Sequence, residues 1–273
     1  MFLPPRRRAR RWLLVVGSAL VGALAVAGWG LQRGDVSLEV LGVQIARPDG
    51  WAPRSTDRSD EPLGSPEPVA EPSDAYAFLA LQDDGTRPIA YDPCRALHVV
   101  VREAGAPPGG RAMVLDAFAR LSRATGLQVV DDGATTEVPS DDRALHQPDR
   151  YGERWAPVLV AWSTPEEDPG LDGDVLGRAG SVGVGLAGGD AVYVTGAVVL
   201  DGPQMTEMLH APDGATTARA GILHELGHLV GLDHLDAPGQ LMHPQLLPGS
   251  VDYAAGDLTG LAELGRGACV PAV

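Results

Sequence analysis

Apolar residues occur along this chain mainly in short runs, separated by stretches rich in glycine, proline or acidic residues. Runs of this length, bounded by turn-forming residues, are typical of buried strands. The sequence therefore predicts strands over residues 96–101, 127–130, 157–162, 181–186 and 191–200. A weaker alternation over residues 36–45 predicts one more short strand, and residues 163–180 are predicted to form an acidic, glycine-rich loop.

Helical spacing of apolar residues appears in three segments. In residues 110–125 the apolar side chains recur every three or four positions, and Gly126 follows as a residue suited to end a helix. Two more helices are predicted over residues 216–230 and 254–264. Because strands and helices alternate early and helices follow late, we expect an α+β (α/β-like) domain built on a mixed sheet.

Composition divides the chain into three parts. Residues 1–33 combine a basic cluster with an apolar run, residues 34–75 are rich in Pro, Ser, Asp and Glu, and residues 76–273 contain most of the predicted strands and helices. A segment with the composition of residues 34–75 cannot bury much apolar surface. We therefore expect an extended linker, followed by a folded domain that begins near Tyr76.

The first part has the layout of a membrane anchor or an export signal. Arginines between residues 6 and 11 precede residues 12–31, which carry no charge. A helix of that length can just cross a bilayer, and the flanking arginines would keep its N-terminal end in the cytoplasm. We expect a single anchor in the cell membrane with the domain outside. The alternative is a signal peptide cleaved near Ala25-Val26-Ala27, which would release a secreted domain.

The charge of the chain limits the kinds of partner that it can bind, and its cysteines indicate the cellular environment in which it folds. The chain has no lysine, and beyond residue 33 it carries 15 arginines against 36 acidic residues. Nucleic acid and anionic lipid repel such an acidic domain, so we expect no nucleic-acid partner, membrane contact through the N-terminal segment only, and a monomer. The two cysteines, Cys94 and Cys269, are expected to form a disulfide in an exported domain. The alternative is two buried free thiols.

One segment points to chemistry. Residues 224–234 read His-Glu-Leu-Gly-His-Leu-Val-Gly-Leu-Asp-His. Positions four apart on a helix lie on one face, so His224 and His228 can bind the same metal ion. Glu225 lies about 100° further round the helix, within reach of a metal-bound water. The apolar residues fall on the opposite side, which indicates that the helix buries one face and presents the ligands on the other.

Gly231 comes where this helix is expected to end, because glycine readily adopts the left-handed conformation that turns a chain sharply. The turn would bring His234 back as a third ligand. Three imidazoles and a water form the open tetrahedral site that is typical of catalytic zinc. Zinc lowers the pKa of its bound water to about 7, and Glu225 is the predicted general base as that water attacks a peptide carbonyl.

The spacing His-Glu-x-x-His-x-x-Gly-x-x-His resembles the signature of the metzincin zinc peptidases. Met242, in Leu241-Met242-His243-Pro244, matches the methionine turn that this group has beneath its zinc, and the form of this turn is most similar to that of the matrixins. The resemblance covers roughly residues 90–265 and is sharp over residues 224–244. It implies a twisted five-stranded mixed sheet with one antiparallel edge strand, and a substrate cleft along that edge.

The chain departs from the matrixin pattern in the segment after Met242. Where matrixins have Pro-x-Tyr lining the specificity pocket, this chain has Pro244-Gln245-Leu246. Pro244 and Leu246 are therefore the expected pocket residues, but the substrate preference of the family cannot be carried over. The chain also lacks a Pro-Arg-Cys-Gly-type switch that would hold such an enzyme latent, and Cys94 is the only upstream thiol.

Matrixins also bind structural calcium in the loop before the edge strand. In the corresponding loop this chain has Asp168, Asp172 and Asp174, whose oxygens suit calcium. The alternative is a solvated acidic loop. No histidine lies there, so no second zinc site is expected.

Taken together, the residues predict a zinc-dependent endopeptidase that cuts an extended peptide paired with the sheet edge. A second possibility is a processing peptidase with one protein substrate at the cell surface. A third, non-enzymatic possibility is a zinc-stabilised adhesion or sensing module. Glu225 argues against the module, because a structural zinc site has no need of a general base beside an open coordination position.

Overall fold

A computed structural model of the chain describes residues 37–40, 44–46, 58–185 and 190–271. All of these belong to one compact unit, Gly34–Val273. The predicted anchor or signal peptide, residues 1–33, lies outside the described residues. Within the described ranges, no helix has the length and apolar character needed to cross a membrane.

The centre of the domain is the predicted five-stranded mixed sheet. Its strand order is β5-β4-β6-β8-β7, and β7 alone runs antiparallel to its neighbour β8. The five strands are β4 Leu97–Arg102, β5 Val129–Ala134, β6 Val158–Ser163, β7 Val175–Gly185 and β8 Ala191–Asp201. This arrangement confirms the α+β fold class. β7 begins six residues earlier than predicted, because Gly177, Arg178 and Gly180 interrupt its apolar pattern.

Two short strands extend the sheet beyond β7. β1, Ser37–Val40, and β2, Gln44–Ala46, both pair with β7 in parallel. They overlap residues 36–45, where a weak alternation predicted one short strand. A separate two-stranded sheet pairs β3, Ala77–Phe78, with β9, Leu232–Asp233, in antiparallel orientation.

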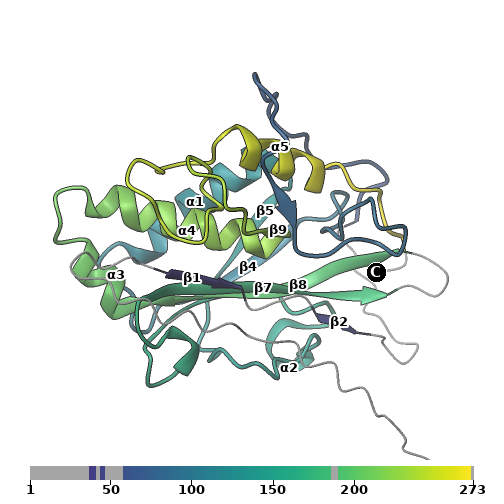
Figure 1. Cartoon of the computed structure of the whole chain (residues 1–273). Coiled ribbons are helices and arrows are strands. Elements are labelled where there is room, and N and C mark those ends of the chain that lie inside the picture. The colour runs from purple at the N-terminus through teal and green to yellow at the C-terminus, as the bar shows by residue number, and fades with distance from the viewer. Residues whose placement is uncertain (1–36, 41–43, 47–57, 186–189, 272–273) are drawn as a thin grey trace, which may run out of the picture. The chain divides into compact units, whose positions relative to one another are not determined.

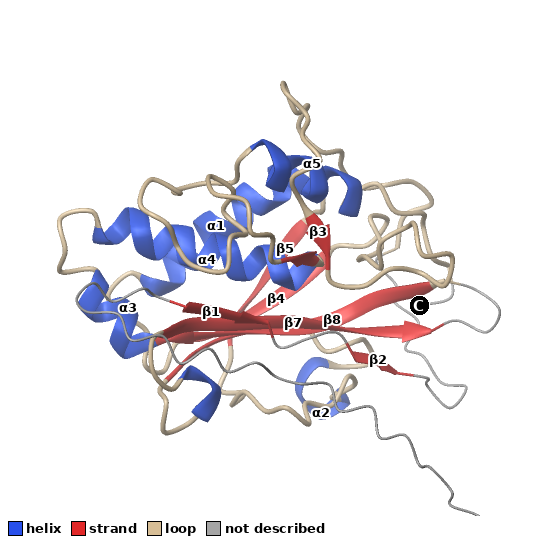
Figure 2. Ribbon diagram, in the orientation of Figure 1, coloured by secondary structure: helices blue, strands red, loops and turns tan. Residues whose placement is uncertain are grey.

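Helices cover both faces of the sheet unequally, as Figures 1 and 2 show. The three longer helices lie together over one face, and the single-turn helix α2, Pro148–Tyr151, lies on the other. The longer helices are α1 Gly110–Thr125, α4 Gly214–Val230 and α5 Ala255–Leu264. Two further short elements, which the sequence pattern did not predict, are the 3-10 helix η1 Pro169–Leu171 and the helix α3 Gly202–Met208.

The main core lies between the sheet and the three longer helices. Val99 and Val160 of the sheet, Phe118 of α1 and Leu223 of α4 are all at most 1% exposed. Gly126 ends α1 with a left-handed φ of 78°, as its position predicted. The predicted helix boundaries hold to within two residues because apolar periodicity and glycine caps are local signals.

Residues 58–75, within the Pro- and acid-rich segment, are extended and lie against the domain. The amide of Ser59 donates to the carbonyl of Cys94, and the amide of Glu67 donates to that of Arg123. A Cβ at Gly126 would lie 2.5 Å from the carbonyl carbon of Ser65, so this glycine permits the close approach. Composition indicates the extended conformation but not the docking, because these contacts are made by the backbone.

Cys94 and Cys269 form the predicted disulfide. Cys94 lies shortly before β4 and Cys269 shortly after α5, so the bond joins the two ends of the region that holds the five central strands and the helices. Replacing both cysteines by alanine is expected to lower the free energy of unfolding by about 2–5 kcal/mol, because the bond restricts the unfolded chain. Urea denaturation with and without reductant measures this. An unchanged midpoint in the double variant would contradict the expectation.

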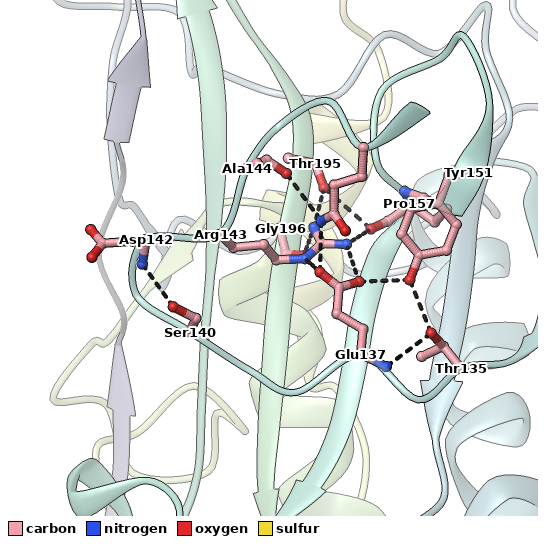
Figure 3. Close-up of polar contacts among 11 residues, drawn as sticks. Thr135, Glu137, Ser140, Asp142, Arg143, Ala144, Tyr151, Pro157, Thr195 and Gly196 are labelled. Carbon is pink, nitrogen blue, oxygen red and sulfur yellow. Dashed lines mark hydrogen bonds and ion pairs between the residues drawn. The ribbon is translucent and has the colours of Figure 1, made fainter. Parts of the chain in front are cut away.

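The chain between β5 and β6 crosses the face of the sheet that carries α2, and a buried ion pair holds it there (Figure 3). Arg143 and Glu137 form a paired contact, Nε–Oε1 2.8 Å and Nη2–Oε2 3.1 Å. Arg143 also donates to the carbonyl of Pro157 and to the hydroxyl of Thr195. Tyr151 donates to the second oxygen of Glu137. The network therefore ties a segment without sequence periodicity to β6 and β8.

Candidate metal centre

Helix α4 presents two of the three predicted ligands. His224 and His228 lie one turn apart and both are completely buried. The helix ends at Gly231, whose φ of 121° lies in the region that favours glycine and whose amide donates to the carbonyls of Gly227 and His228. The predicted role of Gly231 as the turn that follows the helix is thus confirmed, and β9 begins directly after it.

The turn returns His234 to the other two histidines. The three Nε2 atoms form a nearly equilateral triangle, with separations of 2.9 Å for His224–His228 and 3.0 Å for both His224–His234 and His228–His234. His234 is partly exposed, whereas the other two are buried. The structure thus brings together the three residues that the spacing predicted, and they could bind a metal ion.

The surrounding backbone selects the tautomer of the two buried histidines. His224 Nδ1 lies 2.7 Å from the carbonyl of Leu241, and His228 Nδ1 lies 2.8 Å from that of Leu232. A carbonyl can only accept, so each Nδ1 carries the proton and donates. Each Nε2 is therefore left with a lone pair directed into the cluster. Such backbone contacts are the usual way in which proteins orient imidazole ligands for a metal.

Burial keeps these imidazoles neutral. It lowers the pKa of His224 well below its ordinary value, and the neighbouring His228 and His234 lower it further. Burial, followed by the effect of His234, lowers the pKa of His228 to about 3. The pKa of His234 is also lowered, mainly by burial. Neutral imidazole is the form that binds a metal, so the site is in its ligating state at neutral pH.

The donor set fits zinc. Zinc binds histidine nitrogen at about 2.0–2.1 Å, and in a tetrahedral site such ligands lie roughly 3.3 Å apart. The observed separations of 2.9–3.0 Å are close to that value. The Nε2 lone pairs of His224 and His228 face each other at 2.9 Å, so a cation bound between them would relieve their repulsion. Three neutral nitrogens and no sulfur also match the ligand type of catalytic zinc sites.

Glu225 lies beside the cluster in a close contact with β7. Its side chain is completely buried. A Cβ placed on Gly177 of β7 would be 2.9 Å from Cγ of Glu225. Gly177 therefore leaves room for the carboxylate between the helix and the strand. No local pattern in the sequence links residue 177 to residue 225, and only the packing of β7 on α4 reveals it.

Met242 packs against α4 at Gly227, which lies between the two helical histidines in sequence. It is 2% exposed, and its sulfur occupies the space beside Gly227 of α4, 2.5 Å from where a Cβ would stand. Asp257, in the first turn of α5, holds the segment that contains Leu241 and Met242. Its carboxylate accepts from the amides of Leu241 and Met242 at 2.7 and 3.3 Å, and from the amide of Ala254. The carbonyl of Leu241 in turn accepts from Nδ1 of His224. Asp257 therefore positions His224 indirectly, through Leu241.

Replacing Asp257 by asparagine is expected to weaken zinc binding by about 10- to 100-fold, the usual cost of losing a group that orients a ligand. Asparagine keeps the size of aspartate, but its amide nitrogen cannot accept from the backbone amides. Competition with a chelator measures the affinity. Glu263→Gln, an exposed position at the other end of α5, is the matched control. Equal affinity in both variants would show that the turn holds without Asp257.

The structure also locates the other predicted residues. Pro244 is partly buried, and Leu246 is partly buried against the main core. Their role in a specificity pocket stays a prediction. Cys94 is bonded to Cys269 and so is not a free thiol that could bind the metal.

The acidic loop gives the calcium prediction no support. Asp168 pairs with Arg178 and accepts from the amide of Gly170, which makes it the N-cap of η1. Asp168, Asp172 and Asp174 do not form a cluster of convergent ligand atoms. Calcium binding therefore stays a prediction from the resemblance alone.

Comparisons with known proteins do not extend this description. No protein-family model matches the chain, and no curated protein matches it significantly.

Proposed function

We propose that this chain is a zinc-dependent endopeptidase. One observation carries the proposal: three imidazole nitrogens converge within 3.0 Å of one another beside the buried carboxylate of Glu225. Among the described residues, no fourth protein ligand joins this group. A structural zinc site would have four ligands, so an incomplete set next to a carboxylate favours hydrolysis.

Different residues of the chain have different proposed roles in hydrolysis. His224, His228 and His234 would hold a zinc ion, which would supply a Lewis acid and would lower the pKa of a bound water to about 7. Glu225 accepts the proton of the attacking water and then donates it to the leaving amine. The carbonyls of Leu241 and Leu232 keep His224 and His228 oriented throughout. Pro244 and Leu246 are the proposed contacts for the substrate side chain.

The proposal also covers the location of the protein in the cell, its substrate and its oligomeric state. The disulfide is typical of a domain outside the reducing cytoplasm. Residues 1–33 are proposed to anchor the chain in the cell membrane, with release by signal cleavage as the alternative. The proposed substrate is a peptide or protein, and the proposed active form is a monomer without a nucleic-acid partner.

Cleavage of an unstructured protein tests the function. The full chain in mild detergent and a fragment of residues 58–273, which keeps the docked segment, would each be assayed with and without a chelator. We expect one zinc per chain by elemental analysis, and cleavage that the chelator abolishes and added zinc restores. One bound zinc without cleavage by either form would instead favour a zinc-stabilised module, and absence of zinc would contradict the site.

A further inference from the structure

The outer edge of β7 is occupied by the chain's own N-terminal strands. One edge of β7 pairs with β8. On the other edge, residues 175–179 pair with β1 and residues 182–184 pair with β2. Figure 1 shows both short strands at this side of the sheet. Both edges of β7 are therefore paired within the chain.

β1 passes the sheet edge at the level of the metal centre. Its residue Leu38 is paired with Gly177, the glycine that contacts the side chain of Glu225. β1 also lies against helix α4, which carries Glu225 and two of the histidines. The edge of a strand can accept only one neighbouring strand at a given position. An extended peptide that reached Glu225 along β7 would need the backbone positions that β1 holds.

We propose that β1 and β2 close the outer edge of β7 to substrate, so that the full chain is a self-inhibited form of the enzyme. The consequence for activity rests on the proposed function, whereas the pairing does not. Strand addition obtains its affinity from main-chain hydrogen bonds. Inhibition of this kind needs no free thiol, and the two cysteines of this chain are bonded to each other.

The length of the strands determines how firmly they close the edge. β1 has four residues and β2 has three. Short parallel pairings are weak, but a covalent tether raises the local concentration of the strand far above that of a free peptide. If the strands hold the edge in about nine molecules of ten, the apparent affinity for a competing peptide falls about tenfold. At that occupancy the closure would lower activity about tenfold and would still be reversible.

Proline substitutions in the full chain test this inference. Alternate residues of a strand donate to the same neighbour, so Leu38→Pro/Glu39→Pro removes at least one amide that pairs with β7. The double variant Leu38→Ala/Glu39→Ala keeps both amides and is the matched control. Amide hydrogen exchange at residues 175–179 reports the pairing, and cleavage of an unstructured protein reports the activity. We expect faster exchange and about tenfold higher kcat/KM in the proline variant alone.

Four results would overturn the inference, and they are distinguishable. Equal exchange at residues 175–179 in the wild type and the proline variant would show that β1 does not hold the edge. Faster exchange with unchanged kcat/KM would show pairing without inhibition. Cleavage of the wild-type chain by its own site between residues 37 and 46 would make these strands a substrate. If neither the full chain, its proline variant nor the 58–273 fragment cleaves, the proposed function fails and the proposed inhibition fails with it. Amide hydrogen exchange would still show whether β1 pairs with β7.

Discussion

Replacing Glu225 by glutamine is expected to lower kcat/KM for peptide cleavage by about 10²- to 10⁴-fold while the chain still binds one zinc ion. Glutamine has the size of glutamate, which matters because Gly177 leaves little space beside this side chain. Its amide cannot accept the proton of the attacking water, however. The metal ligands and their backbone partners are unchanged, so zinc affinity should stay within a few-fold of the wild type.

The measurement pairs kinetics with metal content in each variant. His228→Ala is the contrasting change, since it removes a ligand and should lose both zinc and activity. Loss of zinc in Glu225→Gln would indicate that the carboxylate supports the site structurally. Wild-type activity in the same variant would rule Glu225 out as the general base.

Replacing Arg143 by alanine is expected to lower the free energy of unfolding by about 3–5 kcal/mol, the usual cost of breaking a buried ion pair. The side chains of Arg143 and Glu137 are only 9% and 8% exposed. Alanine at 143 would leave the Glu137 carboxylate buried without its cation, and the carbonyl of Pro157 without that donor (Figure 3). Urea denaturation measures the loss. Arg150 is also between β5 and β6 but is exposed, so Arg150→Ala is the matched control. It should change the free energy of unfolding by less than about 0.5 kcal/mol.

The same network predicts how stability depends on pH. Burial by itself would raise the pKa of Glu137, but hydrogen bonds from Arg143, Tyr151 and Gln147 outweigh it and lower the pKa below 4.5. A carboxyl whose folded pKa is depressed stabilises the fold above its unfolded pKa and loses that contribution as pH falls through the folded value. We therefore expect the wild type to lose stability below about pH 4.5, and the loss to be smaller in Glu137→Gln.

The sequence by itself determined the cluster of three histidines that could bind a metal ion, because the signals that specify it are local. His224 and His228 are one helical turn apart, and Gly231 ends the helix, so two short-range rules bring His234 to the same point. The strands β4, β6 and β8 and the helix α1 were also predictable to within two residues, since they carry regular apolar patterns and clear caps.

Where apolar residues do not recur regularly along the chain, rules based on neighbouring residues did not predict the structure. The first half of β7 was predicted as loop because two glycines and an arginine stand in it. Gly177 leaves room for the side chain of Glu225, and this contact follows only from the packing of β7 against α4. Asp257 is 15 residues from Met242 in sequence, yet it accepts the amide of Met242 and that of Leu241. Both residues support the site through contacts between separate elements.

Only the tertiary structure decided where the N-terminal segments lie. The composition of residues 34–75 predicts a segment that buries little apolar surface and is extended. It does not predict that β1 and β2 pair with β7, or that residues 58–75 dock beside Gly126. These contacts are made mainly by backbone amides and carbonyls, which every residue except proline carries in full. Their partners depend on which edges and carbonyls the folded domain leaves open, and that information is absent from the side-chain pattern.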